Sequence, residues 1–108
     1  MPLNILGLYR DSDIQGVKKW IAEKKDLNLQ DGWGQTTLML SIRDGDLDVA
    51  ERLIKAGADL DLKNKAGRNA KRYADSVGES YYDDDKHITK WFNRIVKQTK
   101  NKKIYDPF

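Results

Sequence analysis

Apolar and polar positions in the middle of the chain follow the spacing of short amphipathic helices. Between about Thr36 and Arg43, Leu38 and either Ser41 or Ile42 fall on one helical face. Thr36 has a side-chain oxygen that can accept from the first free N–H groups of a helix, so it is a candidate N-cap. The pattern predicts one short helix over this segment.

A second amphipathic segment follows directly. Val49, Leu53 and Ile54 share a face at helical spacing. Gly45 and Gly57 close the two segments, and glycine readily adopts the left-handed backbone that ends a helix. The two segments therefore predict a pair of short antiparallel helices.

The pattern repeats with a period of 33 residues. Moving residues 38–63 back onto residues 5–30 superposes identical residues, both charged and apolar: Arg43 on Arg10, Asp44 on Asp11, Asp46 on Asp13, Ile54 on Ile21, Asp59 on Asp26, Leu60 on Leu27 and Leu62 on Leu29. Moving forward, Asp31, Gly34 and Gly45 recur as Asn64, Gly67 and Gly78. A fixed period of this length indicates stacked helical units, none of which buries enough surface to fold alone.

The middle unit, residues 31–63, resembles an ankyrin repeat. Its characteristic positions are a turn glycine, a threonine-rich helix opening, a glycine between the helices, a Val-x-x-x-Leu-Leu-like second helix and a Gly-Ala-Asp loop; here they are Gly34, Thr36, Thr37, Leu38, Met39, Gly45, Val49, Leu53, Ile54, Gly57, Ala58 and Asp59. Thr37 stands where the family has proline and Met39 where it has histidine. We expect these departures to weaken the bracing of the helix start.

The resemblance implies an all-α fold, an ankyrin-repeat solenoid of helix-turn-helix units with hairpin fingers. We expect a single domain over residues 1–108. Its parts are an N-terminal capping repeat (1–30), a full repeat (31–63), a divergent C-terminal capping repeat (64–100) and a tail (101–108). The tail is expected to be either mobile or docked on the last helix through its apolar residues.

Composition narrows the class of protein. A chain of 108 residues, 34% of them charged, has room for one domain and contains no apolar run long enough to span a bilayer. Residues 1–9 lack the pattern of a secretory signal. Because there is no cysteine, disulfides and thiol chemistry are excluded, and we expect the reducing cytoplasm as the compartment. We also expect a monomer without a cofactor.

Positive charge is concentrated near the C-terminus. Residues 86–108 hold seven Lys and Arg against one acidic residue, although the net charge of the whole chain is only +3. A basic helix and tail of this kind is usually solvated, but it can also contact an acidic protein or a nucleic acid. Nucleic-acid contact through this segment is the alternative to protein binding.

The resemblance also implies where a partner binds. Ankyrin stacks use the hairpin tips and the exposed side of each first helix, on the concave face. Carried onto this chain, these positions give the candidate partner-binding residues Arg10, Asp11, Trp33, Gln35, Arg43, Asp44, Lys65 and Arg68, to which we add Tyr81 and Tyr82 of the loop in the third unit.

Trp33 is the most informative of these residues. A large aromatic side chain at a hairpin tip is not needed for folding there, and Trp and Arg dominate the energetics of protein interfaces. The alternative is that the ring folds back on the neighbouring finger. Trp20 and Trp91, which lie at apolar helical spacings, are predicted to be core or cap residues.

The candidate charges alternate in sign. Arg10 with Asp11 and Arg43 with Asp44 occupy the same positions of successive repeats, which predicts charge ladders on the concave face. Such a ladder is either a solvated surface of weak ion pairs or a contact for a protein. Mixed signs suit a protein better than a nucleic acid, which rewards uniform positive charge.

The segment Tyr81 to His87 is the one place that invites a chemical interpretation. Three consecutive aspartates and the only histidine could supply oxygen and nitrogen ligands to a divalent ion, but the spacing fits no calcium loop. The acidic residues are better explained as the N-terminal charges of a helix running from about Lys86 to Lys100. We therefore expect no metal site.

No motif in the chain predicts catalysis. There is no phosphate-binding glycine loop and no nucleophile with a base at a recognisable spacing. The sequence predicts a non-catalytic binding protein. By analogy with short ankyrin proteins its most concrete function is that of a small inhibitor or immunity protein that occludes a toxin or other enzyme, and the alternative is an adaptor or scaffold.

Overall fold

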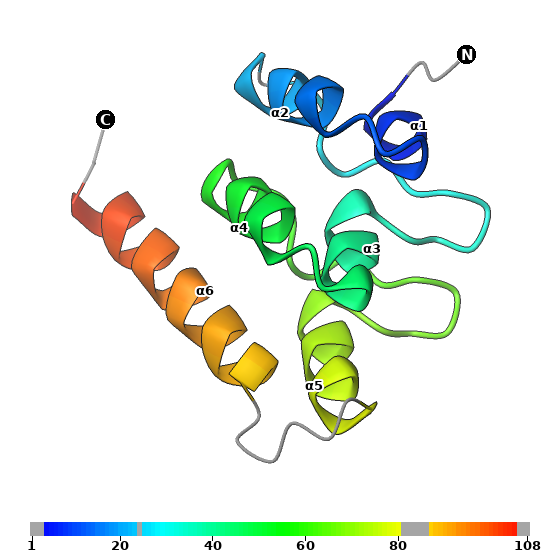
Figure 1. Cartoon of the computed structure of the whole chain (residues 1–108). Coiled ribbons are helices and arrows are strands. Elements are labelled where there is room, and N and C mark those ends of the chain that lie inside the picture. The colour runs from blue at the N-terminus through cyan, green and yellow to red at the C-terminus, as the bar shows by residue number, and fades with distance from the viewer. Residues whose placement is uncertain (1–3, 24, 81–86, 106–108) are drawn as a thin grey trace.

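The computed structural model describes residues 4–23, 25–80 and 87–105, and all the regular secondary structure in them is helical. The elements are α1 (Ile5–Arg10), α2 (Ile14–Ala22), α3 (Thr37–Asp44), α4 (Leu47–Lys55), α5 (Ala70–Ser80) and α6 (His87–Tyr105). They form three consecutive pairs, α1–α2, α3–α4 and α5–α6 (Figure 1). The predicted all-α fold of repeated helix pairs is confirmed.

The pairs stack so that their helices form two rows. In one row α1 contacts α3 and α3 contacts α5, and in the other α2 contacts α4 and α4 contacts α6. Two extended loops project on the same side of the stack, next to the α1–α3–α5 row (Figure 1). We call them the first finger (residues 28–36) and the second finger (residues 61–69).

The start of α3 is well capped despite the departures at Thr37 and Met39. The Met39 N–H donates to Thr36 Oγ1 at 3.2 Å, and the Thr36 N–H donates to Met39 Sδ at 3.5 Å, which together form a capping box. Met39 therefore braces this turn with its sulfur. The Thr37 hydroxyl, by contrast, is buried without a hydrogen-bond partner among the described residues, a cost that proline at the same position would not incur.

The helix ends fall at the predicted glycines. Gly45 caps α3 with φ of 79°, and Gly57 follows α4 with φ of 97°. Ser12, which lies 33 residues before Gly45, takes the same left-handed conformation with φ of 61°. Equivalent positions of successive repeats thus share a backbone conformation even where the residue type differs.

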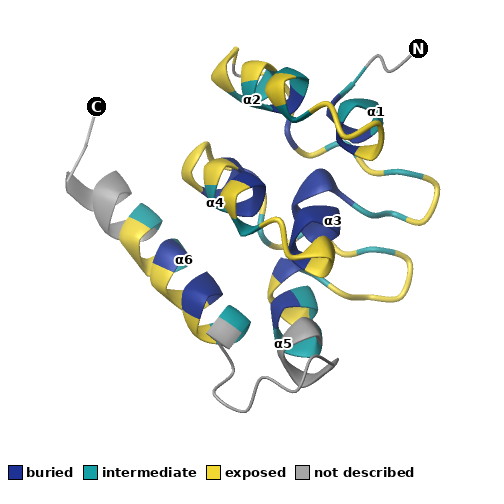
Figure 2. Cartoon of the chain, viewed as in Figure 1, coloured by how far each residue is buried: buried dark blue, intermediate teal, exposed yellow. Residues whose placement is uncertain are grey.

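The core lies where the middle pair meets its neighbours (Figure 2). Leu53 and Ile42 are fully buried at 0% exposure, and Leu38 and Ile54 are at 2%. Among the described residues the outer units contribute fewer buried side chains, and in α2 only Val17 is buried. The middle unit therefore holds the stack together, as expected of a short repeat array whose end units each have one solvated face.

Helix α6 completes the core and runs further than predicted. Trp91 is buried as expected, and Trp20 is partly buried, with its indole N–H donating to the Asp26 carbonyl at 2.8 Å. The helix continues past Lys100 to Tyr105, because its lysines and glutamine favour helix and no proline occurs before Pro107. Among the described residues no helix is long and apolar enough to cross a membrane.

Candidate partner-binding surface

Each finger is shaped by one side chain at its base. Asp31 Oδ1 accepts from the N–H groups of Trp33 at 2.9 Å and Gln35 at 2.8 Å. One repeat later, Asn64 Oδ1 accepts from Ala66 at 2.9 Å and Arg68 at 3.0 Å. Aspartate and asparagine both supply this acceptor, so the fingers keep the same turn although the charge differs.

The two fingers are hydrogen-bonded to each other. The Lys65 N–H donates to the Trp33 carbonyl at 2.9 Å, and Gln30 Nε2 donates to the carbonyls of Gly34 at 2.8 Å and Lys63 at 3.1 Å. The first of these bonds joins the two backbones directly, and the Gln30 amide bridges carbonyls of both fingers. The fingers therefore form a rigid edge on which side chains are displayed.

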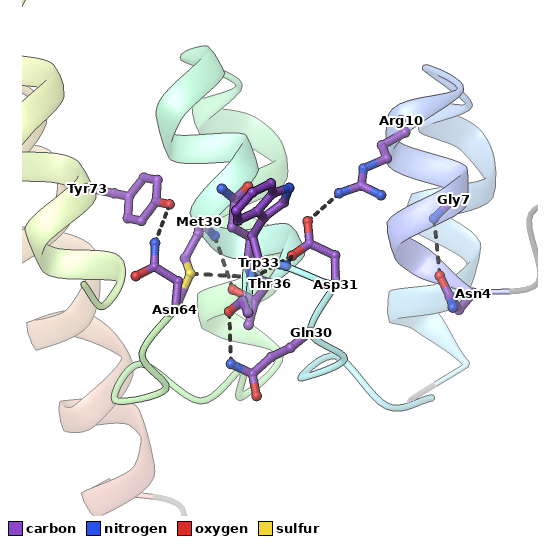
Figure 3. A network of polar contacts seen from close by, with 12 residues as sticks. Asn4, Gly7, Arg10, Gln30, Asp31, Trp33, Thr36, Met39, Asn64 and Tyr73 are labelled. Atoms are coloured by element: carbon purple, nitrogen blue, oxygen red, sulfur yellow. Dashed lines mark hydrogen bonds and ion pairs between the residues drawn. The ribbon is translucent and has the colours of Figure 1, made fainter. Parts of the chain in front are cut away.

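Trp33 stands on this edge with its side chain largely in solvent. It is 72% exposed, and no other large hydrophobic residue that the structure describes is exposed. Figure 3 shows it on the first finger, between the Arg10–Asp31 pair on one side and Asn64 with Tyr73 on the other. The alternative in which the ring packs back onto the neighbouring finger does not hold, because such packing would bury it.

Arg10 reaches from α1 to the base of the first finger. Its guanidinium forms an ion pair with Asp31, whose side chain is only 5% exposed, whereas that of Arg10 is 53% exposed (Figure 3). Burial by itself raises the pKa of Asp31, but the N–H groups of Gln35 and Trp33 and the positive charge of Arg10 outweigh it and hold the pKa below 3.8. The pair fixes the first finger against the first repeat.

We expect Asp31→Asn to lower the free energy of unfolding by about 1 kcal/mol at pH 7, because the amide keeps the turn acceptor but loses the charge that pairs with Arg10. Since the pKa of Asp31 is depressed in the folded state, its stabilisation is complete above 3.8 and disappears as the pH falls through the lower folded value. Urea unfolding of both proteins at pH 7 and at acidic pH should therefore show that the difference between their free energies of unfolding disappears below pH 3.8. A difference that stays the same at acidic pH would mean that the effect of the substitution comes from packing.

A second contact between repeats involves Tyr9 of α1. Its hydroxyl lies 2.6 Å from Asp46 Oδ2 and 3.0 Å from Asp44 Oδ2, so its single proton is held between two carboxylates. Burial, followed by the hydrogen bonds to Asp46 and Asp44, raises the pKa of Tyr9 well above its ordinary value. The phenol remains a neutral donor at physiological pH.

Because Asp46 accepts from Tyr9, its side chain does not cap α4. Its repeat equivalent, Asp13, caps α2 by accepting from the Gly16 N–H at 2.9 Å. Asp46 occupies the same position before α4 but makes no side-chain cap hydrogen bond. Its carboxylate instead accepts from the Tyr9 hydroxyl.

These groups surround a groove of about 500 Å³ between the first two repeats. It is lined by Tyr9, Arg10, Ser12, Ile14, Asp31, Trp33, Gln35, Leu40, Arg43, Asp44 and Asp46. Of the predicted residues, Arg10, Trp33, Gln35, Arg43 and Asp44 therefore come together in one place. A groove with an exposed indole and charges of both signs is suited to contact with another protein.

The remaining predicted residues lie elsewhere. Asp11 is exposed but does not line the groove, and Lys65 and Arg68 are exposed on the second finger. Tyr81 and Tyr82 lie outside the described residues, as does the run Asp83 to Asp85. Among the residues that are described, no group of three His, Cys, Asp or Glu is placed to hold a metal ion.

The two arginines that recur one repeat apart form different ion pairs. Arg43 pairs with the adjacent Asp44, Nε to Oδ1 at 3.1 Å, but Arg10 pairs with Asp31 and not with Asp11. Sequence reasoning missed Tyr9, Asp31 and Asp46 as members of this surface. The repeat carried a signal for Tyr9. This residue has a hydroxyl at the position where the next unit has the buried Ile42, so it needs a hydrogen-bond partner.

A family model described as ankyrin repeats (many copies) matches residues 21–74, half of the chain. The chain belongs to the ankyrin-repeat family. The match begins in α2 and ends in α5, so it contains the first finger, the whole middle pair and the second finger. No curated protein matches the chain significantly.

Ankyrin repeats indicate a protein–protein interaction module, and members of the family generally bind without catalysis. In this ankyrin chain the fingers project beside the α1–α3–α5 row (Figure 1). The lining of the groove combines residues of α1 and α3 with Asp31, Trp33 and Gln35 of the first finger.

Proposed function

We propose that this chain is a binding protein that holds one partner protein in the groove between its first two repeats and acts by covering the partner's surface. The observation that carries the proposal is Trp33, 72% exposed at the edge of a groove of about 500 Å³. Its most concrete function is that of a small inhibitor or immunity protein against a toxin or other enzyme. It acts as a cytoplasmic monomer and performs no chemistry of its own.

The charges of the groove support a protein as the partner. Arg10 and Arg43 lie beside Asp31, Asp44 and Asp46, so the lining is of mixed sign. A phosphate backbone would be repelled by the three carboxylates, whereas a protein surface can match both signs. The rigid fingers lower the entropy lost on binding, because the loops are already ordered.

The test is capture of the partner from the native cells. The tagged wild-type chain and the double variant Trp33→Ala/Arg43→Glu are used as baits, and bound proteins are identified by mass spectrometry. We expect one dominant protein with the wild type, and at least about a tenfold loss of affinity for that protein in the variant, because Trp and Arg supply most interface energy. Inhibition of the captured protein's activity by the wild-type chain would establish the inhibitor function.

The control is Lys18→Ala/Arg52→Glu, which changes exposed or partly exposed positions on α2 and α4 that do not line the groove. This variant should capture the partner as well as the wild type does. Circular dichroism should show the same helical content for all three chains. Equal capture by the groove variant and the wild type would refute the proposal.

A further inference from the structure

We propose that the second finger and the first turn of α5 form an acid-binding patch, which takes an acidic segment of the partner protein. The patch consists of Lys63, Lys65, Arg68, Lys71 and Arg72, all exposed. Residues 63–72 contain no acidic residue. This inference rests on the proposed function and deepens it by giving the chemistry of the partner.

The five cations lack acidic partners among the residues that the structure describes. None of them forms an ion pair with a described residue, whereas ion pairs in the two preceding repeats involve Arg10, Lys18, Lys25, Arg43, Arg52 and Lys55. Like charges this close in sequence repel one another and weaken the fold. Their clustering, with no ion pair to a described carboxylate, therefore favours an external anion as the partner.

Comparison with the first finger shows that the fold does not require these charges. The positions 33 residues earlier are uncharged: Gln30, Gly32, Gln35, Leu38 and Met39. Both fingers nevertheless make the same hydrogen bonds, through Asp31 in one and Asn64 in the other. Exposure of the end unit accounts for polar residues at Lys71 and Arg72, but not for the cations of the finger itself.

The patch is hollowed and its backbone is fixed. Lys63, Arg68 and Arg72 line a depression of about 550 Å³ together with Ala66, Gly67 and Asn69. Asn64 Nδ2 donates to the Tyr73 hydroxyl at 2.8 Å, and Asn69 Oδ1 accepts from the Arg72 N–H at 3.0 Å. Lys63, Arg68 and Arg72 thus border one shared space beside an ordered turn, where carboxylates can bridge them.

The acidic ligand is a protein segment and not a nucleic acid. The hydrogen bond from Lys65 to the Trp33 carbonyl makes the patch continuous with the groove, where Asp31, Asp44 and Asp46 lie. A phosphate backbone extended along the fingers would meet those carboxylates. An acidic segment followed by apolar or basic residues can occupy the patch and the Trp33 groove together.

The test measures binding of a fluorescein-labelled glutamate-rich peptide by fluorescence anisotropy. The patch variant is Lys63→Gln/Lys65→Gln/Arg68→Gln, in which two of the three changes reproduce the residues of the first finger. The matched control is Lys90→Gln/Arg94→Gln/Lys97→Gln, which removes the same number of exposed cations from α6. Both variants have the same net charge, so long-range attraction is equal.

We expect the patch variant to lose about tenfold in affinity for the peptide and the α6 variant to lose less than about threefold. Added salt should weaken peptide binding by both variants. Equal losses would show attraction by net charge alone, and a larger loss in the α6 variant would place the site on α6; either result overturns the proposal. So would tighter, patch-dependent binding of an oligothymidylate of the same length.

The peptide assay is independent of the cognate partner. Trp33→Ala should leave peptide affinity unchanged, because Trp33 does not line the depression. Failure of the capture experiment with intact peptide binding would refute the groove proposal alone. If capture of the partner depends on Trp33 but the acidic peptide does not bind, only the acid-binding patch is refuted.

Discussion

Replacing Leu53 by alanine is expected to lower the free energy of unfolding by about 2 to 5 kcal/mol. Leu53 is 0% exposed on α4, which contacts α2 on one side and α6 on the other. Removing its side chain leaves a cavity in the core that all three units share, and the buried neighbours relax only partly to fill it. Thermal unfolding followed by circular dichroism should show a melting temperature lower by at least about 8 °C.

Leu47→Ala is the matched control, because Leu47 begins the same helix but is only partly buried. Its cost should be about 1 kcal/mol, since less apolar surface returns to water. If the two substitutions cost the same, Leu53 does not occupy the central position that the structure gives it.

A comparably large effect is expected from Gly34→Ala in the first finger. Gly34 has φ of 79°, and an added Cβ would lie 3.0 Å from both Asn64 Cα and Lys65 N of the second finger. The left-handed backbone and the contact with neighbouring backbone together should cost about 2 to 5 kcal/mol. Urea unfolding measures the loss, and displacement of Trp33 should weaken partner binding as well.

Gly67→Ala separates the two causes. Gly67 has the same φ of 79° at the equivalent place in the second finger, but an added Cβ there has nothing within 4 Å. It should therefore cost only the conformational part, about 1 to 2 kcal/mol. Equal losses for Gly34→Ala and Gly67→Ala would mean that the fingers are not pressed together.

The repeat made most of the fold predictable. A period of 33 residues fixed the order of helix pairs, and local chemistry placed the cap at Thr36 and the helix end at Gly45, because these depend on neighbouring residues. The length of α6 was underestimated, since its basic composition was interpreted as a tail although lysine favours helix.

The groove was only partly predictable, because its decisive contacts join residues far apart in sequence. Arg10 meets Asp31 across 21 residues, and Tyr9 meets Asp44 across 35 and Asp46 across 37. Trp33 was found from sequence because the finger position itself determines its exposure, whereas the role of Tyr9 depends on packing between units.

The open surroundings of Gly32 give the first finger room to change its specificity. An added Cβ at this position has nothing within 4 Å, and its backbone is outside the left-handed region that would restrict it to glycine. A side chain can therefore begin at position 32, beside Trp33, without its Cβ meeting the rest of the stack. Position 32 is thus the natural place for selection, in evolution or in a randomised library, to redirect this protein to a new target.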